Sequence, residues 1–332
     1  MKKAYFLTKM IISVTIILIS SGCTANNATE YSGFFMDSYA QFKVWNGQAK
    51  ELSQTAEDLD ALFSMYNENS DIYKINTNAN AVIVHDDTIA IINDTIKLND
   101  EFGGGVDITV GGLTLLWNIT SEKPEIPAKE EIDSALLQTG IDKIEIDSTK
   151  NTVISQGTRL DLGAVAKGYA CDKIKKQLNE TDARCAVVTF GSSSLLYGEK
   201  PDGQPFRVAI KDPEESGGII GTFEADACFV STSGGYERFF EIGGVKYQHI
   251  LDINTGYPAQ TDLISVTVIC DGGLKSDFLS TLIFIGGSKG LDKHLNADDY
   301  SVIAVTQDKI IYISDDIRDS FELSAAEYTV AS

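Results

Sequence analysis

The chain has 332 residues, 43% of them hydrophobic, and its formal net charge is −21 at pH 7. This length and composition suffice for a sizeable core, in one large domain or two closely packed ones, and they exclude a disordered chain. The acidic excess repels phosphate backbones and argues against nucleic acid as a partner. An anionic cofactor would therefore need a metal ion, a helix N-terminus or a few well-placed cationic side chains.

The N-terminal segment predicts export. Three lysines within the first nine residues precede an apolar run over 10–19, which is too short to span a membrane as a stable helix. Small residues then lead into Cys23, a pattern that resembles a bacterial lipobox, although Ser20 stands where that pattern prefers leucine. We expect a lipoprotein signal peptide over residues 1–22, acylation of Cys23 and a tether over residues 23–30, which together anchor the protein by lipid on the extracytoplasmic face of the cell membrane. A cleaved signal peptide with a chance cysteine is the alternative.

The remainder, residues 31–330, is expected to form one domain. Its first half shows helical periodicity, and after a strand at 34–45 the predicted helices are 51–63, 88–102, 109–117 and 130–137. Its second half is mostly strand-like around two helices at 163–178 and 276–285. The predicted strands there are 143–146, 152–155, 186–190, 206–210, 221–224, 228–231, 239–242, 246–250, 264–270, 301–306 and 309–314. Gly243-Gly244, between 239–242 and 246–250, predicts a hairpin. The pattern predicts an α+β fold, in which a helical N-terminal part packs on a strand-rich, largely antiparallel C-terminal part.

Four further cysteines lie in this domain, namely Cys171, Cys185, Cys228 and Cys270. Each sits in an apolar stretch without a CxxC spacing or a neighbouring histidine, which favours free, buried thiols over a zinc site. Export permits disulfides, so their pairing stays open at this stage.

The usual phosphate and metalloprotease signatures are missing. No GxxxxGK[ST] occurs, no GxGxxG follows a strand and opens a helix, and no HExxH is present. A catalytic histidine must be His85, His249 or His294, because the chain has only these three.

Two helix-associated segments carry candidate chemistry. Asp161 precedes a predicted helix start, where backbone N–H groups can meet a phosphate, and Lys167 lies about one turn in. A capped helix with a solvated lysine is the alternative. Asp277 and Thr281 are four residues apart, which places a carboxylate and a hydroxyl on one helical face and suits Mg²⁺. A helix cap followed by an interior threonine is the alternative there.

A third segment combines a Ser/Gly run with a histidine. Residues 231–236 could offer hydroxyls and backbone amides to an anion. His249 leaves an apolar strand just before a turn closed by Gly256 and Pro258. A purely structural histidine is the alternative.

Taken together, these segments resemble the FAD:protein FMN transferase (ApbE) family over nearly the whole mature chain. Seven motifs follow one another in the family order, which is far more specific than any one of them. They are 35–38, 62–66, 106–111 with 115–117, 161–168, 231–234, 249–258 and 276–281.

The resemblance implies a role for twelve residues. Asp277, Thr281 and the backbone carbonyl of Ala164 match the magnesium ligands, and His249 matches the residue proposed to activate the acceptor hydroxyl. The matched FAD contacts are Met36, Tyr66, Gly105, Val106, Asp107, Asp161, Lys167 and Ile250. Val106 stands where an aromatic residue is common, Gly112 where proline is common, and Ala164 replaces a frequent glycine.

The expected activity follows from the resemblance. It is the Mg²⁺-dependent transfer of FMN from FAD to a threonine hydroxyl of an acceptor flavoprotein, with release of AMP. The acceptor is expected in an extracytoplasmic electron-transfer system. The ordinary histidine pKa of about 6.5 suits a general base near neutral pH. An FAD pyrophosphatase that yields FMN and AMP, and a non-enzymatic, lipid-anchored flavin carrier, are the alternatives.

Overall fold

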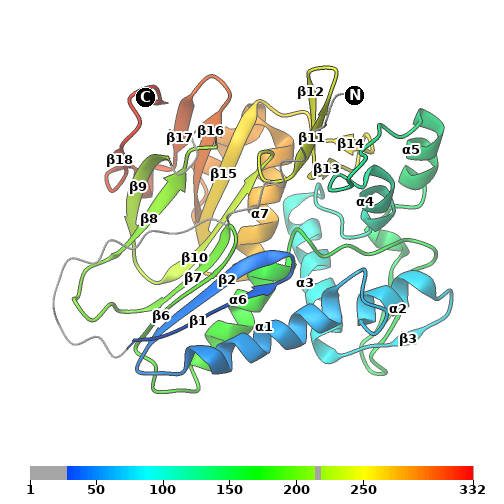
Figure 1. The fold of residues 1–332 in the computed structure, drawn as a ribbon, viewed down its shortest axis with the longest axis horizontal. Coiled ribbons are helices and arrows are strands. Elements are labelled where there is room, and N and C mark those ends of the chain that lie inside the picture. Colours follow the sequence, from blue (N-terminus) through cyan, green and yellow to red (C-terminus); the bar gives the residue numbers. More distant parts are fainter. Residues whose placement is uncertain (1–27, 214–217, 332) are drawn as a thin grey trace, which may run out of the picture.

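The computed structural model describes residues 28–213 and 218–331 (Figure 1). The predicted signal peptide and Cys23 lie outside these ranges. The first strand begins at Ala28, so the last three residues of the expected tether are strand instead. The reason is pairing, because Ala28 to Glu30 align with Lys43 to Trp45 of the next strand. None of the helices in the described ranges has the length and apolar character that crossing a membrane requires.

A single large sheet organises the described part of the chain. Its nine strands lie in the order β1-β2-β6-β7-β10-β15-β16-β17-β19, and all neighbours are antiparallel except β17 and β19. The strands are β1 (Ala28–Phe35), β2 (Ser38–Trp45), β6 (Cys185–Phe190), β7 (Ser193–Gly198), β10 (Cys228–Gly234), β15 (Leu263–Cys270), β16 (Tyr300–Thr306), β17 (Ile310–Ile313) and β19 (Thr329–Val330). This arrangement confirms the α+β class with a largely antiparallel sheet.

The first strand pair corrects the prediction of one continuous strand at 34–45. Met36 and Asp37 form a two-residue turn between β1 and β2, with φ angles of 50° and 54°. Such turns match the twist of a hairpin but normally use glycine or asparagine, because a side chain at positive φ is strained. Neither Met36 nor Asp37 signals a turn of this kind, so the sequence pattern concealed it.

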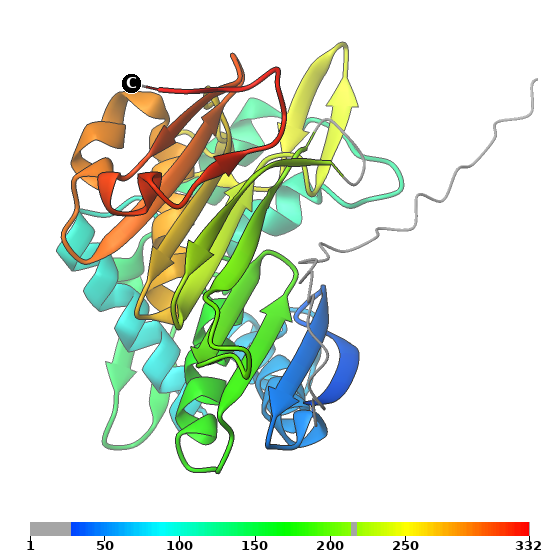
Figure 2. The same ribbon diagram turned by 90° about the vertical axis from the view of Figure 1, so that its left-hand side faces the viewer.

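The two faces of the sheet are covered differently. One face packs against the helices α1 (Ala49–Phe63), α3 (Asp86–Phe102), α6 (Ala166–Leu178) and α7 (Gly273–Gly286). The other face packs against a small sheet of β8 (Phe206–Lys211), β9 (Ile219–Ala225) and β18 (Glu322–Leu323). Because both faces are covered, central strands such as β6 and β16 are buried at every position. Figure 1 shows the helices α6 and α7 on one side of the large sheet and β8 and β9 on the other, and Figure 2 views the molecule from the side of β8 and β9.

The helices α6 and α7 cross without room for side chains. A Cβ on Gly168 would lie 2.1 Å from the carbonyl oxygen of Gly273, and a Cβ on Gly273 would lie 2.2 Å from that of Gly168. The Asp172 carboxylate of α6 accepts hydrogen bonds from the N–H groups of Gly273 and Leu274, at 2.7 and 2.8 Å. These bonds satisfy open N–H groups at the start of α7. The crossing therefore fixes where the first turns of both helices lie.

A third apolar cluster closes one end of the molecule. It joins α4 (Gly111–Trp117) and α5 (Lys129–Leu136) to the hairpin of β11 (Phe239–Ile242) and β12 (Val245–Gln248). The hairpin confirms the prediction made from Gly243-Gly244, and it projects beyond the body in both views (Figures 1 and 2). The remaining elements are α2 (Asp71–Thr77), β3 (Val82–Ile83), the 3₁₀ helix Ile141–Lys143, β4 (Glu145–Asp147), β5 (Thr152–Ile154), β13 (Leu251–Asp252), β14 (Tyr257–Pro258), the 3₁₀ helix Ser288–Gly290, α8 (Leu291–Leu295) and α9 (Asp315–Arg318).

The four cysteines of the described ranges are free thiols, in keeping with the favoured interpretation. Cys171, Cys185 and Cys270 are buried, and Cys228 is half-buried. Desolvation raises the pKa of Cys185 and of Cys228 to about 12, so both thiols are inert at neutral pH.

Candidate active site

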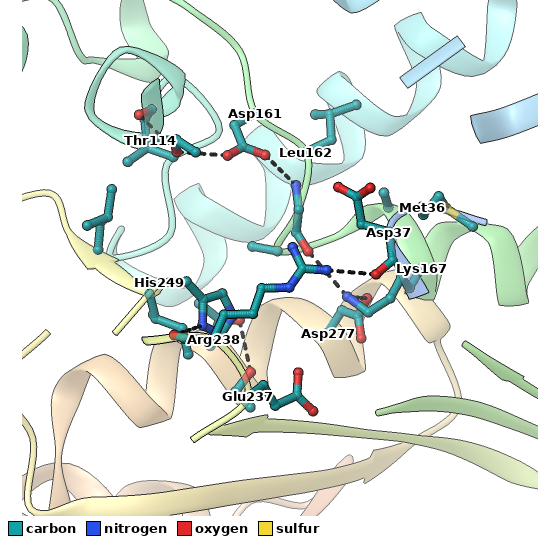
Figure 3. A pocket seen from close by; sticks show the side chains of 18 of the residues that line it. Met36, Asp37, Thr114, Asp161, Leu162, Lys167, Glu237, Arg238, His249 and Asp277 are labelled. Carbon is teal, nitrogen blue, oxygen red and sulfur yellow. Dashed lines mark hydrogen bonds and ion pairs between the residues drawn. The ribbon is translucent and has the colours of Figure 1, made fainter. Parts of the chain in front are cut away.

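One cleft, with a volume of about 310 Å³, brings the residues of the sequence motifs together (Figure 3). Its lining comes from the β1–β2 turn, the end of α1, the segments before α4 and α6, β10, both ends of the β11–β12 hairpin, and α7. All twelve candidate residues line it, namely Met36, Tyr66, Gly105, Val106, Asp107, Asp161, Ala164, Lys167, His249, Ile250, Asp277 and Thr281.

Asp277 occupies the floor of the cleft on α7. Its Oδ2 accepts a 2.7 Å hydrogen bond from the N–H of Gly168, and its Oδ1 accepts a 2.6 Å hydrogen bond from the hydroxyl of Ser193. The residue Asp277 is only 4% exposed, so these two bonds fix the orientation of its side chain. The hydroxyl of Thr281, one turn further along α7, lies 3.1 Å from that of Ser233 on β10. The predicted shared face of these two residues is therefore present.

The donor atoms at this point fit a hard divalent cation. They are the Asp277 carboxylate and the Thr281 hydroxyl, and Ala164, whose carbonyl the resemblance adds, lines the same cleft. Each carboxylate oxygen of Asp277 accepts only one hydrogen bond, which leaves lone pairs for a metal. Mg²⁺ is commonly held by one or two carboxylates together with substrate phosphates. In the parts of the chain that the structure describes, no group of three or more His, Cys, Asp or Glu side chains could hold a metal. The donor set thus suits an ion that is shared with a bound phosphate.

The turn before α6 differs from its prediction. The helix begins at Ala166 rather than at 163, and Asp161 does not cap it. Instead, Asp161 accepts hydrogen bonds from the Gly163 N–H at 2.9 Å and from the Thr114 hydroxyl at 2.8 Å. These bonds hold the turn against α4 and leave Lys167 in the first helical turn. The Lys167 Nζ donates to the Gly163 carbonyl at 3.3 Å and lies 3.9 Å from Oδ2 of Asp277.

His249 lies on the hairpin side of the cleft. Its N–H donates to the Arg238 carbonyl at 3.0 Å, and its ring Nδ1 lies 3.3 Å from the same oxygen. Desolvation, followed by the positive charge of Arg238, lowers the pKa of His249 to about 4. This differs from the ordinary value expected from the sequence. The imidazole is therefore neutral at pH 7, and the carbonyl favours a proton on Nδ1, which leaves Nε2 as the acceptor.

The predicted flavin contacts show two kinds of environment. Tyr66 is 63% exposed at the cleft, and Gly105 adopts a φ of 110°, where a Cβ would meet Leu282 at 2.4 Å. Asp107 lines the cleft too, but its carboxylate accepts hydrogen bonds from the N–H and hydroxyl of Thr109 and from the N–H of Ile141. The Asp107 carboxylate therefore stabilises its own loop and ties it to the segment at Ile141.

Several lining residues escaped the sequence analysis. They are Asp37, Asp60, Thr114, Ser193, Ser233, Glu237 and Arg238. Desolvation raises the pKa of Asp60, whose carboxylate accepts the N–H of Met36. It also raises the pKa of Glu237, although this residue is exposed to solvent at the cleft. Ser233 belongs to the Ser/Gly run and Asp37 to the motif 35–38 already noted, whereas the others follow no local signal.

Comparisons with known proteins agree with this geometry. The chain is 29% identical over 267 residues to the FAD:protein FMN transferase of Haemophilus influenzae, which covers 77% of this chain and 76% of that protein. A Klebsiella pneumoniae protein of the same name is 29% identical over 92% of this chain and 98% of its own length. The crystal structure of the ApbE protein from Thermotoga maritima, 29% identical, covers 87% of this chain and 98% of its own, with a TM-score of 0.80.

The flavinyl transferase ApbE of Pseudomonas stutzeri, 26% identical, superposes with a TM-score of 0.78 over 90% of this chain and 98% of its own. The family model described as the ApbE family matches residues 36–305, which include all twelve candidate site residues. The chain therefore belongs to the ApbE family.

Proposed function

We propose that this protein transfers FMN from FAD to a threonine hydroxyl of an acceptor protein, with Mg²⁺ as cofactor and AMP as the released product. The observation that carries the proposal is the position of a buried Asp277, paired with Thr281, in the same cleft as a neutral His249. The names of the relatives, FAD:protein FMN transferase, supply the substrate and the acceptor class.

The chain's own groups divide the work. When bound beside Asp277, Thr281 and the Ala164 carbonyl, Mg²⁺ would neutralise the pyrophosphate and make AMP a better leaving group. Lys167 adds a cation in the first turn of α6, 3.9 Å from Oδ2 of Asp277. Ser193 and the Gly168 N–H keep Asp277 in position.

The transfer itself exchanges one P–O bond for another. The threonine oxygen forms a bond to the phosphorus on the flavin side, and the bond from that phosphorus to the bridging oxygen breaks. Nε2 of His249 accepts the hydroxyl proton, and AMP leaves with the bridging oxygen. The low pKa of His249 makes it a weak base that is fully available at pH 7, so its value lies in position more than in basicity.

The test measures two products in one reaction. The full chain without its first 22 residues is incubated with FAD, Mg²⁺ and a threonine-containing acceptor fragment, and AMP release and in-gel flavin fluorescence of the acceptor are followed. Both signals together support the transferase. AMP release without acceptor labelling would instead indicate a pyrophosphatase, and FAD binding without AMP would indicate a carrier.

Anchoring through Cys23 is a separate proposal. It rests on the charged start, the apolar run and the small residues before the cysteine. Such an anchor would hold the cleft on the extracytoplasmic face of the membrane, near an acceptor of an electron-transfer system.

A further inference from the structure

The cleft is short of positive charge for an anionic substrate. Its lining includes six acidic side chains, namely Asp37, Asp60, Asp107, Asp161, Glu237 and Asp277. Only Lys167 and Arg238 oppose them. Binding of a pyrophosphate in this cleft therefore depends on the bound metal and on whether these two cationic side chains are free to contact the phosphates.

The two cationic side chains differ in the hydrogen bonds and ion pairs that they already make. Lys167 lies 3.9 Å from the Asp277 carboxylate and donates to Gly163, so part of its charge is already opposed. Arg238 has no carboxylate within salt-bridge distance among the residues that the structure describes, and its side chain makes one hydrogen bond to them, a 2.7 Å bond from Nη2 to the carbonyl oxygen of Asp37. A guanidinium has five N–H donors, so most of its capacity is unused.

The Arg238 side chain spans the cleft. It starts beside His249 at the base of the β11–β12 hairpin and ends at the β1–β2 turn, 201 residues away in the chain (Figure 3). The bond to Asp37 is a bond to a neutral carbonyl, which a phosphate oxygen can replace with a stronger, charge-assisted one. The guanidinium thus lies across the cleft, and its hydrogen bond to the neutral Asp37 carbonyl is one that a phosphate can replace.

The backbone of the same residue serves His249. The Arg238 carbonyl accepts the His249 N–H and faces its Nδ1. A displacement of Arg238 would therefore also change the position of the carbonyl that orients the His249 ring.

We propose that Arg238 is the phosphate-binding cation of this site, and that its guanidinium leaves Asp37 to hold the FAD pyrophosphate while its carbonyl keeps His249 oriented for the transfer. This inference deepens the proposed function and rests on it for the identity of the ligand. The side chain supplies affinity for the phosphates, and the main chain positions the base.

The test compares two flavins that differ in their phosphates. FAD and riboflavin are titrated, by flavin fluorescence in EDTA, against the wild type, Arg238→Gln and Arg238→Lys. Arg238→Gln should weaken FAD binding by about 10- to 100-fold, the value of a charge-assisted hydrogen bond, and leave riboflavin binding unchanged. Arg238→Lys should lie between the two. Arg207→Gln, which removes one positive charge on the outer face of β8, is the matched control and should bind FAD as the wild type does.

The outcomes are distinguishable. An equal loss for both flavins, or no loss for FAD, would overturn the role of Arg238. If Arg238→Gln is poorly folded in a thermal melt, Arg238→Lys decides, because a folded lysine variant that loses riboflavin affinity as much as FAD affinity, or loses neither, would also contradict the proposal. A wild type that binds FAD but transfers nothing would sink the proposed function alone, since the flavin comparison does not depend on turnover.

Discussion

The main-chain N–H of Gly168 donates a 2.7 Å hydrogen bond to Oδ2 of Asp277, and this bond links α6 to α7 at the floor of the cleft. The link is possible because neither Gly168 nor Gly273 has a side chain at the crossing. The position of the candidate metal ligand thus depends on a contact between two backbones.

Gly168→Ala should therefore impair the site, although Gly168 is not itself a candidate metal ligand. The added Cβ would lie 2.1 Å from the Gly273 carbonyl oxygen, so the helices must move apart. Overpacking of this kind costs about 1–3 kcal/mol, which outweighs the gain of about 1 kcal/mol in helix propensity. We expect lower stability in urea unfolding and at least a roughly tenfold loss of AMP release. Gly286→Ala at the end of α7, where a Cβ meets nothing within 4 Å, should retain both.

Substitutions at Thr281 isolate the hydroxyl. Thr281→Val keeps the shape but removes the oxygen, and the loss of one polar ligand of about 1–1.5 kcal/mol should raise the Mg²⁺ concentration for half-maximal AMP release by about tenfold. Thr281→Ser retains the oxygen and should behave nearly as the wild type.

Asp277→Ala should abolish AMP release while the protein stays folded. Normal turnover of Asp277→Ala in metal-depleted buffer resupplied with Mg²⁺ would show that the metal lies elsewhere.

His249→Ala should separate binding from transfer. FAD affinity should be retained, because binding needs no proton transfer, whereas transfer to an acceptor should fall by about 10²–10⁴-fold. The assay is flavin labelling of an acceptor fragment beside an FAD titration. Wild-type transfer rates would remove His249 from the mechanism, and a loss of FAD affinity would recast it as a binding residue.

The wild-type pH profile provides a second view of His249. Its pKa is lowered to about 4, so the neutral base is present throughout pH 5.5 to 7. The transfer rate should therefore show no decline with a midpoint near 6.5, which an ordinary histidine base would produce. In Arg238→Gln the loss of the nearby positive charge should move the acid limb of the profile toward higher pH. A midpoint near 6.5 in the wild type would contradict the desolvation of His249.

His294 should make the fold sensitive to acid. Burial, followed by the charge of Lys293, lowers its pKa to about 4, and its Nδ1 lies 2.7 Å from the Tyr300 hydroxyl. Since the unfolded chain takes up this proton near 6.5, stability is fully present above that pH and is lost as the pH falls toward 4. The loss is on the order of 1–3 kcal/mol. His294→Gln should show a smaller drop in urea midpoint from pH 7 to pH 5 than the wild type, and an equal drop in both proteins would exclude His294 as the cause.

Cys23→Ala tests the anchor. The variant should leave the membrane fraction for the medium or periplasm, or accumulate unprocessed, because acyl chains need the cysteine sulfur. Immunoblots of fractionated cells give the answer. Normal processing with unchanged membrane retention would exclude lipidation at this residue.

Sequence patterns predicted those parts of the fold that depend on local chemistry. Apolar spacing located α1 and α3, and Gly243-Gly244 located the β11–β12 hairpin. The β1–β2 turn was missed because Met36 and Asp37 hold a backbone conformation that their side chains disfavour. Motif order placed twelve residues in one cleft, but it could not reveal Arg238, whose partner is 201 residues distant. Nor could it give the low pKa of His249, which results from burial in the finished fold.

The cleft is lined by residues from Met36 to Ile285, and hydrogen bonds across it join segments as far apart as Asp37 and Arg238. No shorter stretch of the chain contains the whole lining. A growing chain therefore has no complete cleft until α7 has been synthesised and has docked on α6. Contacts between such distant segments form late and slow the search for the native state. The ability to bind FAD should consequently appear in a single, last step of folding. Truncated chains that end before α7 should lack this ability.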